Sequence, residues 1–65
     1  MTEKDKLEVL EIIKRFPELL QIFVLYRTLT WENFISKYNE EDRAFMGFAK
    51  LTEYEYEKVR EWFNG

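Results

Sequence analysis

The sequence has no cysteine and no histidine, and it contains only one serine, one proline and two glycines. Without cysteine the chain can form no disulfide and offers no thiolate to a metal ion. Without histidine it has no imidazole to bind a metal or to act as a base near neutral pH. Disulfides and structural metals are the usual reinforcements of a small fold. The domain must therefore be held together by side-chain packing or by a partner protein.

Catalytic and metal-binding patterns are also scarce. Nucleophilic catalysis needs a hydroxyl or thiol beside a base, and Ser36 has no histidine to activate it. Glu40, Glu41 and Asp42 are consecutive, and consecutive side chains on a helix point in different directions. They lack the spaced oxygen ligands of a calcium-binding loop. We therefore expect a protein that is not an enzyme, with no catalytic residue, no metal ligand and no cofactor.

The charge distribution argues against direct binding of nucleic acid. Thirteen acidic residues outnumber ten basic ones, which gives a net charge of −3, and the basic residues are spread along the whole chain. Such a surface repels the phosphates of duplex DNA. A helix-turn-helix built from residues 31–38 and 40–49 would present three acids at the start of its second helix, where the major groove would lie. The expected partner is another protein.

Export and membrane insertion are not predicted either. Residues 1–6 are not followed by the apolar core of a signal peptide. The longest apolar stretch, residues 19–26, is interrupted by Gln21 and is far too short to cross a bilayer. Sixty-five residues make one small domain. We expect this domain to be cytoplasmic, to stay out of the membrane, and to be a monomer when free.

The spacing of apolar residues predicts an all-α fold, a compact bundle of four to five short helices that forms a single interaction domain over residues 1–65. The segment over residues 18–27 is apolar on almost every side, so it should be the most buried element. Its composition also suits a strand, and a helix is favoured because the chain offers no other clear strand for pairing. The expected helices cover about residues 4–15, 18–27, 31–38, 40–49 and 53–63.

Residues that favour helix ends support several of these boundaries. Thr30 is expected to cap the third helix, and Asn39 either ends that helix or caps the next one. Thr52 and Glu55 have the spacing of a capping box, in which each side chain accepts a hydrogen bond from the backbone of the other. The capping box predicts that the last helix begins directly after Thr52.

The expected helix over residues 40–49 contains Gly47, which should weaken it by roughly 1 kcal/mol relative to alanine. Its apolar side is supplied in part by Phe45 and Phe48. These rings belong to a set of large aromatics that offers a generous core without help from the last helix, namely Phe23, Trp31, Phe34, Phe45 and Phe48.

The last helix carries Tyr56, Val59, Trp62 and Phe63 on one face. At about 100° per residue these four side chains fall within a sector of roughly 120°. Large aromatic side chains dominate the energetics of protein interfaces. The face therefore has two interpretations: it fills a pocket on another protein, or it closes the core of its own domain. The charged residues Glu57, Lys58, Arg60 and Glu61 are expected to be solvated.

The spacing of these four residues resembles the box with which proteins bind the sliding clamp, proliferating cell nuclear antigen (PCNA). That box has a glutamine, an aliphatic residue three positions later, and two aromatics three and four positions beyond. Val59, Trp62 and Phe63 match it, whereas Tyr56 stands in place of the glutamine. In length, acidity and helical character the chain also resembles the small inhibitors of the sliding clamp found in Thermococcales archaea.

This resemblance implies an archaeal protein that binds the clamp and inhibits clamp-dependent DNA replication. Val59, Trp62 and Phe63 would then enter the pocket of the clamp where its other partners bind, with Tyr56 at the first position of the box. Two alternatives remain open: a helical adaptor or structural protein whose last helix packs in its own core, or an acidic regulator of another nucleic-acid enzyme. Exposure of Trp62 and Phe63 in the free domain would favour docking.

Overall fold

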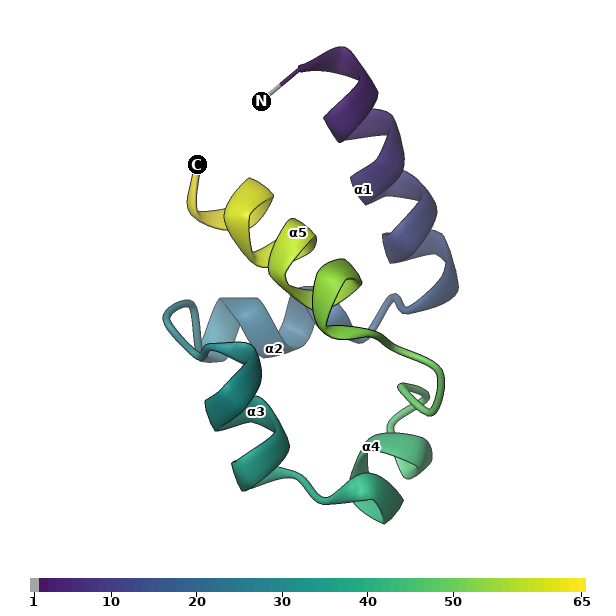
Figure 1. Cartoon of the computed structure of the whole chain (residues 1–65), viewed down its shortest axis with the longest axis vertical. Coiled ribbons are helices and arrows are strands. Elements are labelled where there is room, and N and C mark those ends of the chain that lie inside the picture. Colours follow the sequence, from purple (N-terminus) through teal and green to yellow (C-terminus); the bar gives the residue numbers. More distant parts are fainter. Residues whose placement is uncertain (1) are drawn as a thin grey trace.

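The computed structural model describes residues 2–65, and within them the chain forms five helices and no strand (Figure 1). The prediction of an all-α bundle is confirmed, and the segment that could have been a strand is a helix. None of the helices in residues 2–65 combines the length and the apolar character needed to cross a membrane. The helices are α1 (Glu3–Arg15), α2 (Leu19–Leu25), α3 (Trp31–Lys37), α4 (Glu40–Phe45) and α5 (Glu53–Asn64).

Helix α5 is the central element, because α1, α2 and α3 all pack against it. It runs antiparallel to α1, since Lys58 pairs with Asp5 at 2.7 Å while Arg15, at the other end of α1, pairs with Glu55 at 2.5 Å. In Figure 1 both termini lie at one end of the molecule and α4 lies at the other. The two ends of the domain therefore present different surfaces.

The predicted caps are confirmed at three helices. The side chains of Thr30 and Asn39 accept backbone hydrogen bonds at the starts of α3 and α4. Thr52 and Glu55 form the expected capping box at the start of α5. A second capping box, formed by Thr2 and Asp5, begins α1 and was not predicted. Each of these caps satisfies backbone N–H groups that have no partner within the helix.

The predicted helix over residues 40–49 is wrong in its second half, because α4 ends at Phe45. Gly47 has a φ of +91°, a conformation that glycine adopts at little cost. The chain reverses there, and the N–H of Phe48 donates to the carbonyl of Arg43 at 2.7 Å. Gly47 therefore ends the helix instead of weakening its interior. As a result, Phe48 is buried whereas Phe45 is not.

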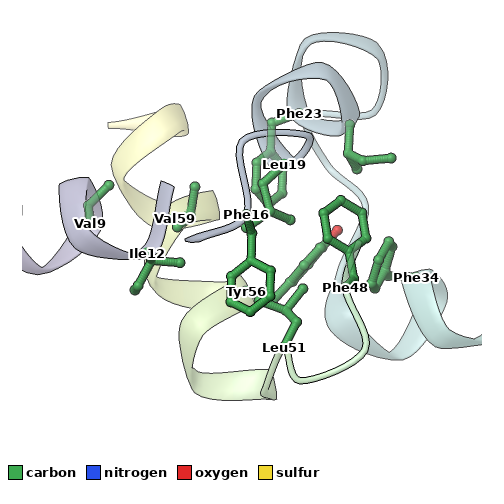
Figure 2. Close-up of a cluster of buried hydrophobic side chains, with 11 residues drawn as sticks. Val9, Ile12, Phe16, Leu19, Phe23, Phe34, Phe48, Leu51, Tyr56 and Val59 are labelled. Carbon is green, nitrogen blue, oxygen red and sulfur yellow. The ribbon is translucent and has the colours of Figure 1, made fainter. Parts of the chain in front are cut away.

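The core lies where α5 meets α1, α2, α3 and the segment after α4 (Figure 2). Tyr56 has no exposed surface, and its ring stacks on that of Phe34 with centroids 4.6 Å apart. Its hydroxyl donates a hydrogen bond of 2.7 Å to the carbonyl of Leu29. The other large buried side chains are Val9, Ile12, Phe16, Leu19, Ile22, Phe23, Phe34, Phe48, Leu51 and Val59.

Two expectations about burial are wrong. Helix α2 is not buried on every side, because Val24 and Leu25 face solvent while Leu19, Ile22 and Phe23 pack inward. The predicted core position of Phe45 is also wrong, since this side chain is 95% exposed. A helix covered by its neighbours on one side leaves the apolar residues of its other side in contact with water.

Candidate protein-binding surfaces

The structure divides the aromatic face of α5 into a buried part and an accessible part. Tyr56 and Val59 are completely buried. Phe63 is half-buried, and its ring lies 5.9 Å from that of Phe23. Trp62 is 36% exposed. Two of the four predicted contact residues can therefore reach a partner while the domain stays folded.

The helical repeat explains the exposure of Trp62. At 100° per residue Phe63 lies between Tyr56 and Val59 when α5 is viewed along its axis, whereas Trp62 lies at the edge of the sector. The side of the sector that holds Tyr56 and Phe63 is covered by α2 and α3, which bring Phe23 and Phe34 against it. Trp62, at the opposite edge of the sector, is not covered by α2 or α3. The indole of Trp62 is thus held by an ordered helix without being enclosed.

Trp62 lines a hollow of about 400 Å³ between α1 and the C-terminal end of α5. We call this the terminal hollow, and its lining is Lys6, Glu61, Trp62 and Gly65. The hollow offers one large aromatic wall, one cation and one anion. Leu10, which is also exposed, lies one turn beyond Lys6 on the same side of α1. The exposed indole therefore offers an apolar contact surface flanked by charged groups.

Of the four charged residues of α5 that were expected to be solvated, Glu57, Lys58 and Arg60 are half-buried and only Glu61 is exposed. Glu57 accepts a hydrogen bond of 2.8 Å from the backbone N–H of Trp31, and its other oxygen pairs with Arg60 at 2.8 Å. Lys58 donates to Asp5, and this hydrogen bond is the main cause that lowers the pKa of the Asp5 carboxyl from 3.8 to about 2. These bonds fix α5 to α1 and α3, and so hold Trp62 in place.

Burial also changes the pKa of Tyr56, the residue at the first position of the predicted box. It raises the pKa of the Tyr56 hydroxyl well above 10, with the nearby carboxylate of Glu57 acting in the same direction. The hydroxyl therefore stays protonated and remains a donor to Leu29. Tyr56 is a structural residue in this fold.

A second surface, which the sequence did not predict, lies between α2 and the end of α4. It is a groove of about 360 Å³ whose apolar lining is Ile22, Leu25, Phe45, Met46 and Phe48. We call it the α2–α4 groove. From the sequence, Phe45 and Phe48 have the spacing of neighbours on one helical face, so both were expected in the core. The turn at Gly47 separates them, which a helical pattern cannot indicate.

Among residues 2–65 there is no group of three or more acidic, cysteine or histidine side chains placed to hold a metal ion. Comparison of the chain with models of protein families, with curated proteins and with solved structures finds no match.

Proposed function

We propose that this protein is a cytoplasmic protein–protein interaction module that binds the DNA sliding clamp and inhibits clamp-dependent replication. The observation that carries the proposal is the exposed indole of Trp62, held at the edge of α5 beside the terminal hollow. The spacing of Tyr56, Val59, Trp62 and Phe63 supports the clamp as the partner, because it resembles the clamp-interacting box.

The different burial of the four box residues supports different roles for them in this proposal. Trp62 is the anchor that enters the apolar pocket of the clamp, and Phe63 contributes its exposed part. Tyr56 and Val59 stay in the core and position the helix. A folded domain that presents its anchor already in place loses less conformational entropy on binding than a free peptide does.

Inhibition of replication would follow because a folded domain covers more of the clamp surface than a short peptide does. The domain measures 34 × 21 × 17 Å, and Lys6 of α1 and Gly65 line the hollow beside the anchor. When Trp62 occupies the pocket, the rest of the domain covers the surface around it and excludes other clamp-binding proteins. The function is competitive occupancy, without catalysis, a cofactor or contact with DNA.

The test is to mix the protein with an archaeal sliding clamp and to measure the mass of the complex by size exclusion with light scattering. We expect co-elution at micromolar concentration, and a loss of affinity of at least about tenfold for Trp62→Ala. Tyr54→Ala is the matched control, because Tyr54 is an exposed aromatic of the same helix that lies outside the terminal hollow. Absence of co-elution, or equal affinity of Trp62→Ala and the unmodified protein, would refute the proposal.

The burial of Tyr56 and Val59 favours a second candidate, a helical adaptor or structural protein whose last helix serves its own core. In that case the clamp does not bind, and Trp62→Ala changes only the stability of the domain. The same co-elution measurement, combined with the unfolding of the variant in urea, separates the two candidates.

A further inference from the structure

Phe45 is the most exposed of the large apolar side chains between residues 2 and 65, with 95% of its surface accessible. It is the last residue of α4 and stands beside the α2–α4 groove, where Leu25 is also largely exposed. An apolar surface that is open to water and hollowed beside an aromatic ring is typical of a binding site. Because Phe45 buries almost none of its surface, its side chain contributes little to the stability of the domain.

The backbone around Phe45 is held by specific contacts. The guanidinium of Arg43 donates a hydrogen bond of 2.6 Å to the carbonyl of Tyr38, which ties α4 to the end of α3. On the other side, Gly47 reverses the chain and Phe48 is anchored in the core. The exposed ring therefore projects from a fixed segment, which reduces the entropy that a partner must remove on binding.

The ionisable part of the lining of the α2–α4 groove is acidic. Glu18 is the only ionisable residue in the lining that the structure describes. Glu41 and Asp42 precede Phe45 by four and three positions on α4, so they lie on the same side of that helix. A complementary partner carries lysine or arginine on either side of its apolar residues. A second copy of this acidic chain would place carboxylates against carboxylates.

We propose that the α2–α4 groove binds a short amphipathic segment of another protein, with apolar side chains that enter the groove beside Phe45 and basic residues that face Glu18, Glu41 and Asp42. This site is separate from the surface proposed for the clamp, because α4 and the C-terminus lie at opposite ends of the molecule in Figure 1. The domain can therefore hold two partners at the same time.

The experiment uses two synthetic peptides of about 12 residues, which have leucine and phenylalanine at helical spacing and either lysine or glutamate at all polar positions. Each is titrated into the isotopically labelled protein, and the amide resonances are followed by NMR. We expect the lysine peptide to shift the resonances of Ile22, Leu25, Met46 and Phe48. Binding should weaken as the salt concentration rises from about 50 to about 300 mM.

The variant Phe45→Ser should reduce the affinity for the lysine peptide at least about tenfold. Because Phe45 is exposed, the spectrum of the free variant should keep the dispersion of the folded protein. Val24→Ser is the matched control, since Val24 is an exposed apolar residue of α2 outside the groove, and it should bind as the unmodified protein does.

Three outcomes would overturn the proposal. The first is the absence of shifts at about 1 mM lysine peptide, and the second is equal binding of the glutamate peptide. The third is a dimer of the protein alone, seen by analytical ultracentrifugation and abolished by Phe45→Ser, which would make a second copy the occupant of the groove.

Discussion

The hydroxyl of Tyr56 donates a hydrogen bond of 2.7 Å to the carbonyl oxygen of Leu29, 27 residues earlier in the chain. This bond joins α5 to the connection between α2 and α3, and the tyrosine ring stacks on Phe34 in the centre of the core. A glutamine at this position would supply a polar group without the aromatic bulk that fills the space. The fold therefore uses position 56 for packing, with the tyrosine ring buried in the core.

Tyr56→Phe should lower the free energy of unfolding by about 1 kcal/mol, the typical net contribution of one hydrogen bond. The ring remains, so the packing against Phe34 and Phe23 is kept. Urea unfolding followed by circular dichroism measures the change. Tyr54→Phe is the control, because Tyr54 is exposed and its hydroxyl should contribute less than about 0.5 kcal/mol. Equal effects of the two variants would contradict the structural role assigned to Tyr56.

Trp62→Ala and Phe63→Ala should separate binding from stability. Phe63 packs against Phe23, so its removal should cost about 2 kcal/mol or more, because it leaves a gap in the core. Trp62 lies at the surface, and its removal should cost about 1 kcal/mol or less. Thermal and urea unfolding of the two variants test this order. The reverse order would mean that Trp62 is the core residue and that Phe63 faces the solvent.

The ion pair between Lys58 and Asp5 should make stability depend on pH in the acid range. The hydrogen bond from Lys58, followed by those from Thr2, lowers the pKa of Asp5 from 3.8 to about 2 in the folded state. Since the folded pKa is below the unfolded one, the stabilisation is complete above about pH 4 and is lost as the pH falls towards 2. The pKa of Glu55 is also lowered: burial opposes this, but hydrogen bonds from Thr52 and Arg15 outweigh burial.

Asp5→Asn should therefore flatten the decrease in the urea midpoint between about pH 4 and pH 2. Lys58→Met should flatten it in part, because the hydrogen bonds from Thr2 to Asp5 remain. If the urea midpoint of Asp5→Asn falls between about pH 4 and pH 2 as steeply as that of the unmodified protein, the Asp5 carboxylate is not linked to folding.

Gly47→Ala should destabilise the domain by about 1 kcal/mol, although an added methyl group has no atom within 4 Å. The cost arises in the backbone, because a φ of +91° is unfavourable for a residue with a Cβ. Gly47→Asn should cost less, since asparagine tolerates positive φ better than alanine does. Urea unfolding of both variants gives the comparison, and an alanine variant as stable as the glycine protein would mean that the turn after α4 can rearrange.

Local features of the sequence were sufficient to predict the helices and most of their ends. A helical face repeats every three to four residues, and the caps at Thr30, Asn39 and Thr52 act within three residues of their own position. The end of α4 was predicted wrongly because glycine is compatible both with a helix interior and with the left-handed turn that ends one.

Which apolar residues reach the surface was decided only by the tertiary structure. Tyr56, Trp62 and Phe63 belong to one helical sector, and their different exposure depends on where α2 and α3 cover it. The contacts that hold α5 in place join residues 26 to 53 positions apart, so no local pattern indicates them. Local sequence patterns predicted four to five helices and an aromatic face on the last one. Packing between distant segments determined that Trp62 and Phe45 remain accessible, because burial depends on which neighbour covers each side of a helix.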